Sequence, residues 1–132
     1  MISNIKINTA TTLTLLSVVI AQPKQKVEFE YYTVRDGLSE NSVDVVLQDK
    51  KGFIWAGTEN GLCRFDGYDF KVFEHNPFDS TTLMGNAIVS LFQDSKERLW
   101  IGTGPGLNRY DPPTESFIRY PHELNNKNSI PQ

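Results

Sequence analysis

Short runs of alternating apolar and polar residues, separated by turn residues, fill the chain after residue 40. Residues 41–48 alternate and are rich in β-branched side chains, which is typical of a strand. Residues 53–58, 62–65 and 69–73 follow at short intervals and predict three more strands. No stretch after residue 22 has a convincing helical period. The pattern therefore predicts a four-stranded antiparallel sheet.

The residues between these runs suit tight turns. Asp49 opens the first turn, where its carboxylate can bond the backbone downstream, and Gly52 closes it with the positive φ that such turns require. Asn60-Gly61, between the second and third strands, is a strong hairpin signal. Asp66 opens the third turn in the same manner as Asp49.

The whole arrangement returns 45 residues further along the chain. Residues 86–93, 99–103, 107–110 and 117–120 predict the strands of the second copy. Glu97 stands where the first copy has Gly52, so this turn must differ or accept backbone strain. Together with Gly52, the residues common to both copies form the repeat signature, which consists of Asp49, Gly52, Trp55, Gly57, Thr58, Gly61, Leu62 and Asp66, then Asp94, Trp100, Gly102, Thr103, Gly106, Leu107 and Asp111.

A four-stranded sheet with large apolar side chains on both faces cannot bury them alone. In each copy a tryptophan, Trp55 or Trp100, points one way, and the neighbouring Ile54 or Ile101 points the other way. Stacking sheets around an axis solves this problem in β-propellers, whose repeats have periods of about 40–50 residues. The glycine two positions after each tryptophan predicts a close backbone approach. We therefore expect an all-β fold with two propeller blades, residues 41–77 and 78–120.

The ends of the repeat region predict further pieces of the same pattern. Residues 29–32 share a Phe-x-x-aromatic spacing with the fourth strands. We therefore expect residues 22–40 to form an orphan fourth strand, at residues 27–34, and a linker. Residues 121–132 predict the start of a third blade. A ring of six to eight blades would need about 270–360 residues. We therefore expect a truncated front part of a larger propeller, completed by further blades or by another protomer.

The first 21 residues differ from the rest of the chain. Lys6 is their only charged side chain, and residues 13–20 form an apolar run of signal-peptide length, followed by a possible cleavage site after Ala21. The run is shorter than the roughly 20 residues of a membrane span. A buried strand or short helix is the alternative. We expect a signal peptide at residues 1–21 and a periplasmic location.

Composition and charge exclude several classes of function. The chain carries 13 basic and 16 acidic side chains, and no cluster of Lys and Arg that would bind nucleic acid. Cys63 is the only cysteine, so an internal disulfide and a cysteine-based metal site are excluded. Its apolar neighbours predict a buried hydrophobe rather than a reactive thiol. His75 and His122 lie in connections without a partner pattern, and we expect no metal and no cofactor.

Residues 36–70 resemble the two-component regulator propeller repeat. The resemblance rests on the signature residues in two registered copies, with Ala56, Glu97 and Pro105 as departures from the usual pattern. It implies the periplasmic sensor half of a hybrid two-component system, in which an immunoglobulin-like domain, a membrane helix, a histidine kinase and a receiver follow. Many such sensors respond to oligosaccharides. Membrane attachment would then come only from parts outside these 132 residues.

The resemblance makes a ligand-sensing module without catalytic activity of its own the leading hypothesis. A propeller enzyme of the lyase type is an alternative, but it would need a general base and usually a metal. A structural or protein-binding propeller is the third possibility. This third possibility predicts no response to small molecules, whereas the sensor predicts stabilisation by a specific sugar.

Propeller ligands usually bind where the connections between blades gather. The candidate loops are residues 35–40, 75–85 and 121–129, together with the hairpin tips at 59–60 and 104–105. Tyr68, Arg64 and Arg109 have side chains that can stack on or hydrogen-bond a sugar. The two arginines recur with the strand, however, which favours a structural bond to a neighbouring blade. No individual ligand-binding residue is predicted.

Overall fold

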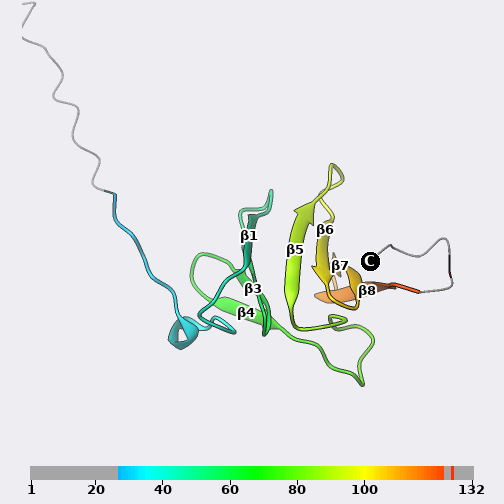
Figure 1. Ribbon diagram of the computed structural model, residues 1–132. Coiled ribbons are helices and arrows are strands. Elements are labelled where there is room, and N and C mark those ends of the chain that lie inside the picture. Colours follow the sequence, from blue (N-terminus) through cyan, green and yellow to red (C-terminus); the bar gives the residue numbers. More distant parts are fainter. Residues whose placement is uncertain (1–26, 124–125, 127–132) are drawn as a thin grey trace, which may run out of the picture. The chain divides into compact units, whose positions relative to one another are not determined.

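The computed structural model describes residues 27–123 and residue 126. Contacts divide the chain into two units, Met1–Glu30 and Tyr31–Gln132. Residues 27–30 of the first unit are in no helix or strand. The predicted signal peptide, residues 1–21, and most of the predicted third-blade start lie outside the described residues. All regular structure described below belongs to the second unit (Figure 1).

The second unit contains two antiparallel sheets of four strands, each in simple sequential order. The first sheet consists of β1 (Val45–Gln48), β2 (Ile54–Thr58), β3 (Gly61–Phe65) and β4 (Phe70–Phe73). The second consists of β5 (Ile88–Gln93), β6 (Leu99–Thr103), β7 (Gly106–Asp111) and β8 (Ser116–Pro121). The predicted eight strands and their pairing are therefore confirmed, and each sheet is one blade.

The first strand of each blade is shorter than predicted, because an asparagine before it bonds elsewhere. In the first blade, the Asn41 side chain accepts a hydrogen bond from the Val34 N–H at 3.0 Å, and β1 begins only at Val45. In the second blade, the side-chain oxygen of Asn86 accepts from the His75 N–H at 2.7 Å. Both asparagines fasten the preceding connection instead of extending the strand.

The predicted strand at residues 27–34 is wrong as secondary structure. Residues 27–33 form no strand, and η1 (Val34–Asp36) is a 3-10 turn with a capping box between Thr33 and Asp36. A strand needs a partner to bond its backbone groups, and none of the described strands pairs with this segment. Tyr32 nevertheless packs its ring against Phe65 and Phe70 of the first blade.

The main core lies between the two sheets, where β5 packs beside β1 and β2. The side of the first blade that carries Trp55 meets the side of the second that carries Ile101, and these two side chains are 1% and 0% exposed. The buried members of this core are Trp55, Leu62, Phe73, Leu83, Ile88, Leu99, Ile101, Tyr110 and Phe117. The expectation that the sheets stack face to face is confirmed.

Gly57 lies at the closest approach of the two sheets. A β-carbon at this position would lie 2.6 Å from Ile88 Cγ2 and 2.7 Å from Val45 Cγ1, which is too close for any side chain. A β-carbon at Gly102 would meet the hydroxyl of Ser90, its partner on the neighbouring strand of the same sheet. Both glycines therefore stand where neighbouring side chains leave no room for a β-carbon.

A second buried cluster covers the opposite face of the first blade. It consists of Leu38, Ala56 and Cys63, with Phe70 packed against them. Cys63 is fully buried, as predicted, and its sulfur accepts a hydrogen bond from the N–H of Ser39 at 3.3 Å.

The two aspartate turns keep the same shape despite the exchange of glycine for glutamate. Gly52 has φ of 94°, and Glu97 at the matching position has φ of 62°. The sequence left open whether the second turn differs or is strained. The turn keeps its shape, and Glu97 carries the backbone strain. A left-handed conformation costs an L-residue other than glycine about 1–2 kcal/mol.

We expect Glu97→Gly to stabilise the protein by about 0.5–1 kcal/mol in urea unfolding, because relief of the strain exceeds the added flexibility of the unfolded chain. The Lys50–Glu97 ion pair that is lost is exposed and contributes little. Glu97→Ala, which keeps the strain, is the matched control and should change stability far less. Equal effects of the two substitutions would contradict this account.

Candidate functional site

Asp49 and Asp94 each tie a turn to the tryptophan of their own blade. One carboxylate oxygen of Asp49 accepts from the N–H groups of Lys51 and Phe53 at 2.9 and 3.0 Å, and the other accepts from the Trp55 indole at 2.8 Å. Asp94 bonds its own turn in the same way and accepts from the Trp100 indole at 2.9 Å. These aspartates are therefore structural turn residues, as their recurrence indicated.

The threonines of the signature hold the other end of each hairpin. The Thr58 hydroxyl donates to the carbonyl of Gly61 at 3.0 Å, and the Thr103 hydroxyl donates to the carbonyl of Gly106 at 2.8 Å. Gly61 has φ of 123°, which a side chain would strain. The remaining signature aspartate of the first blade, Asp66, accepts from two backbone N–H groups of its own turn, and these bonds lower the pKa of its carboxyl.

The predicted ligand-binding loops gather at the threonine end of the blades. The N–H of Gly61 donates to the backbone carbonyl of Asn86 at 3.0 Å, which joins a hairpin tip to the connection between the blades. In the second blade the N–H of His122 donates to the carbonyl of Pro105 at 3.4 Å. These bonds join hairpin ends to neighbouring connections, and much of the loop at 121–129 lies outside the described residues. Ligand binding by these loops stays a prediction.

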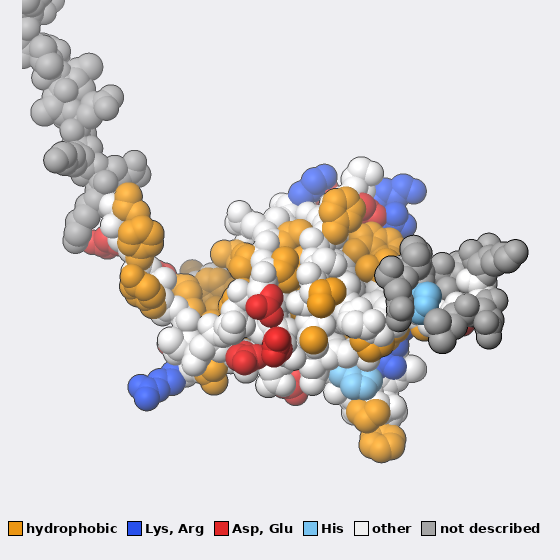
Figure 2. Space-filling model, in the orientation of Figure 1, with side chains coloured by type: hydrophobic (Ala, Val, Ile, Leu, Met, Phe, Trp, Pro, Cys, Tyr) orange, Lys and Arg blue, Asp and Glu red, His pale blue; other side chains and the backbone are white. Residues whose placement is uncertain are grey.

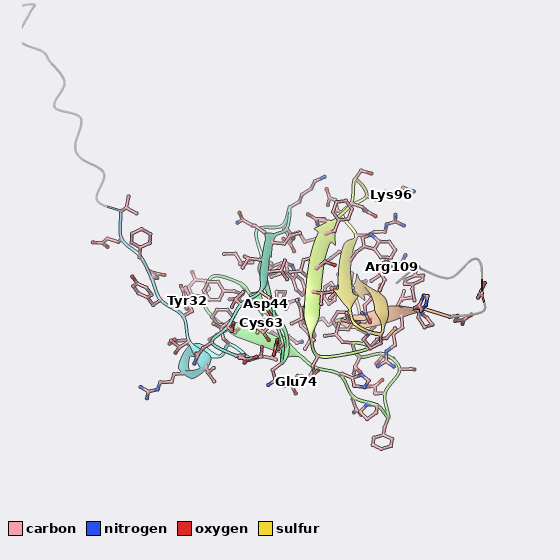
Figure 3. The ribbon with its side chains drawn as sticks, viewed as in Figure 1. Tyr32, Asp44, Cys63, Glu74, Lys96 and Arg109 are labelled. Carbon is pink, nitrogen blue, oxygen red and sulfur yellow. The ribbon has the colours of Figure 1, made fainter. Side chains whose placement is uncertain are left out.

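A cavity opens at the opposite end, beside the aspartate turns. It has a volume of about 500 Å³ and is lined by both blades. Figure 3 shows the two ends, with Lys96 near the cavity end and Glu74 near the loop end. We call this cavity the turn-end groove, and its lining includes Asp49, Lys51, Trp55, Lys96, Arg98 and Asp111. The predicted loops did not include this end.

The turn-end groove carries positive charge that is not neutralised by its own residues. Its acidic side chains have partners, and Glu97, for example, lies 3.6 Å from the ammonium group of Lys50. The ammonium groups of Lys51 and Lys96 make no hydrogen bond or ion pair with any described residue. Figure 2 shows Lys and Arg side chains gathered at this end. The groove can therefore accept a ligand rich in hydrogen-bond acceptors.

Arg64 crosses from the first blade to the second. Its guanidinium donates to the hydroxyl of Tyr110 at 2.8 Å and to the carboxylate of Glu115 at 2.8 Å. Lys71 also pairs with Glu115. The guanidinium carbon lies 4.9 Å from the centre of the Phe53 ring. Arg64 therefore bonds the neighbouring blade, which is the structural role that its recurrence in both repeats favoured.

The other two candidate sugar contacts are not brought to one site with Arg64. Tyr68 is 91% exposed in the β3–β4 turn. Arg109 is half-buried, lines the turn-end groove, and bonds no described side chain. A role for either residue in ligand binding stays a prediction.

Two polar residues that the sequence reasoning missed fasten the connection between the blades. Asn108 is fully buried and accepts from the Met84 N–H at 3.0 Å, while its amide donates to the carbonyl of Ile101 at 3.2 Å. Arg119 donates to the carbonyls of Thr82 and Leu83 at 2.7 and 2.8 Å. Cys63 and Val72 occupy the matching positions of the first repeat. Comparison of the two repeats therefore gave no reason to single out Asn108 or Arg119.

Among residues 27–123 and 126, no group of three His, Cys, Asp or Glu side chains is placed to hold a metal ion. In the same residues no helix is long and apolar enough to cross a membrane.

The two repeats match a known family in sequence. Residues 37–60 and 82–104 match the profile of the family described as two component regulator propeller. Histidine kinase P4 of Formosa agariphila is 39% identical over 80 residues, which is 61% of this chain and 6% of that relative. The chain thus spans a small part of the relative's length.

Solved structures show the same arrangement of blades. The extracellular domain of a proposed hybrid two component system of B. thetaiotaomicron has a TM-score of 0.68 and 32% identity, over 76% of this chain and 14% of that domain. A second extracellular domain from the same organism has been described as part of a proposed one component system and of a proposed hybrid two component system. Its two structures have a TM-score of 0.52 and identities of 36% and 34%, over 59% of this chain and 11% of that domain.

The fold and the inter-blade contacts define two consecutive blades of a β-propeller. The family match and the structural neighbours go one step further. The repeats of this chain are two-component regulator propeller repeats, of the kind found in extracellular domains of hybrid two-component systems.

The pKa of the Asp94 carboxyl lies well below its ordinary value, chiefly because the Trp100 indole donates to it and also because Arg98 does. A carboxyl whose pKa is lowered by folding stabilises the protein above its unfolded pKa of about 3.9, and this stabilisation is lost as pH falls below that value. We expect Asp94→Asn to be less stable than the unchanged protein at pH 7, and the difference in urea unfolding to shrink between pH 5 and pH 2.

Asp44→Asn is the matched control for this experiment. Asp44 is exposed, and its side chain makes no hydrogen bond with a described residue, so the substitution should change stability little. A difference between Asp94→Asn and the unchanged protein that stays constant from pH 7 to pH 2 would refute the proposed role of the charge.

Proposed function

We propose that this chain is part of an extracytoplasmic ligand-sensing propeller of a two-component receptor and that its ligand is an oligosaccharide. The observation that carries the proposal is the pair of registered repeats, which match the propeller family and superpose on extracellular domains of such systems. The role of this chain is then to bind ligand and to transmit a change in blade packing, while the phosphoryl-transfer chemistry belongs to other parts of the receptor.

The signature chemistry supports binding rather than catalysis. The recurrent carboxylates Asp49, Asp66 and Asp94 are each engaged by hydrogen bonds from their own turn. A general base needs a free lone pair and a shifted pKa near the working pH. The pKa shifts of Asp66 and Asp94 are downward, away from neutral pH. A lyase mechanism through these residues is therefore disfavoured.

The turn-end groove is the best candidate for the ligand contacts that this chain contributes. Its volume of about 500 Å³ is in the range of small-molecule sites. Lys51 and Lys96 offer donors to sugar hydroxyl or acidic groups, and Phe53 contributes an aromatic side chain to the same lining. The loops at the threonine end, including residues 35–40, are the second candidate.

We propose an extracytoplasmic location, with membrane attachment through other parts of the receptor. The structural neighbours are extracellular domains, which agrees with the export that the apolar N-terminal segment predicts. The signal peptide itself lies outside the described residues. We also propose that further propeller repeats pack against this pair of blades.

We expect one class of oligosaccharide to raise the thermal unfolding temperature of the purified protein by several degrees in a saturable manner, since a ligand that binds only the folded state stabilises it. A panel of neutral and acidic oligosaccharides, measured by differential scanning fluorimetry, tests this expectation. If no member of the panel shifts the unfolding temperature, the proposed ligand class is wrong.

Two variants locate the ligand. Lys51→Ala combined with Lys96→Ala removes two ammonium groups from the lining of the turn-end groove, and Arg35→Ala removes an exposed cation from the opposite loops. Loss of the ligand-induced shift only in the double variant supports the groove. Loss only in Arg35→Ala would contradict the groove and support the loops.

A further inference from the structure

The sheet face that carries the tryptophan is buried to different extents in the two blades. On the first blade this face carries Trp55, Leu62 and Phe73, and the second blade covers it almost completely. The equivalent side chains of the second blade stand on the face directed away from the first blade, where all three are half-buried. These equivalents are Trp100, Leu107 and Tyr120, which we call the second-blade outer face, and Trp100 and Tyr120 pack together with ring centroids 5.6 Å apart.

The polar part of this face is also repeated. In the first blade Trp55 is paired across the strands with Arg64, and in the second Trp100 is paired in the same register with Arg109. Arg64 uses its guanidinium to bond a hydroxyl and a carboxylate of the next blade, Tyr110 and Glu115. Arg109 has no such partner among the described residues. Arg109 is therefore a half-buried cation placed for the same pair of contacts.

The groups that Arg64 bonds define what a partner for Arg109 must carry. Tyr110 lies on the third strand of its blade and pairs with Phe117 of the fourth strand. Phe65 and Phe70 form the equivalent pair in the first blade. Phe65 therefore stands where Tyr110 does and lacks the hydroxyl. By the same register Tyr68 stands where Glu115 does, and it lacks a carboxylate.

We propose that the second-blade outer face docks a further propeller repeat that carries a tyrosine and an acidic residue at the positions of Tyr110 and Glu115, and that Arg109 bonds both. The first blade of a second copy of this chain is not the partner. Its matching residues, Phe65 and Tyr68, would give the Arg109 guanidinium neither the tyrosine hydroxyl nor the carboxylate that Arg64 bonds, which is unfavourable for a cation that becomes buried. Arg109 thus restricts which blade can pack against the second-blade outer face. Apolar packing alone would accept any blade.

The packing of Tyr32 gives independent support for this order of blades. Tyr32 contacts Phe65 and Phe70 on the outer face of the first blade. Phe73 contacts Tyr110 and Phe117 of the second blade in the same way. The segment before the first blade therefore already fills part of the place that a preceding blade would take, and it does so without an arginine.

The proposal is tested by converting the first blade into an acceptor. We expect the unchanged chain to show weak self-association in sedimentation velocity and equilibrium runs. Phe65→Tyr combined with Tyr68→Glu supplies the missing hydroxyl and carboxylate and should tighten head-to-tail self-association at least tenfold. Adding Arg109→Ala should remove the gain, and Arg109→Lys should restore little of it, because lysine lacks the planar fork that reaches both groups.

Two outcomes of this experiment would overturn the proposal. One is self-association of the unchanged chain that Arg109→Ala weakens tenfold, since a second copy would then be a sufficient partner. The other is a double variant that keeps the circular dichroism spectrum of the unchanged chain and gains no association.

A second construction answers the question even if the double variant fails to fold. Repeating residues 75–121 once, directly after Pro121, places a second tyrosine and glutamate after Arg109 within one chain. Arg109→Ala and a Tyr→Phe change in the added copy of Tyr110 should each lower the equilibrium constant of folding at least threefold. Together they should have no larger effect than Arg109→Ala alone. Independent, additive effects would show that the two groups do not bond.

Discussion

The structure depends on the burial of a tryptophan-bearing sheet face by the next sheet. A single four-stranded sheet of this repeat has large apolar side chains on both faces and can bury neither by itself. Trp55 becomes 1% exposed only because Ile101, Tyr110 and Phe117 of the second blade cover it. The glycine at position 57 permits the approach, since a β-carbon there would overlap Ile88. Blade stacking is thus a requirement of the fold rather than an additional contact.

Within each blade, the most distinctive residues of the repeat serve this stacking. Asp49 and Asp94 hold the first turn and orient the indole of the following tryptophan by a direct hydrogen bond. Thr58 and Thr103 hold the hairpin at the far end. These residues recur because each blade needs the same turn, the same orientation of its tryptophan and the same hairpin. We therefore expect ligand recognition in such a module to fall to residues outside this signature. Lys51 and Lys96, which stand at matching positions of the two repeats, are candidates because both line the turn-end groove.

Contacts between blades combine a general apolar layer with a directional polar bond. The apolar layer accepts any sheet of the same kind, whereas Arg64 requires a hydroxyl and a carboxylate at defined positions. Asn108 and Arg119 add bonds that belong to this one junction, because each fastens the connection that leads from the first blade into the second. Each junction between blades thus combines a shared apolar layer with its own set of polar bonds.

The sequence by itself determined the strands, their turns and the family, because alternation, turn residues and the 45-residue period are local or repeated properties. It also indicated that Cys63 is buried and that the aspartates are structural. It did not show that residues 27–34 would be without strand pairing, because a strand exists only with a partner. It did not locate the turn-end groove, whose walls come from turns more than 40 residues apart. Only the tertiary structure decided which face of each blade is covered, since that depends on which sheet lies next to it.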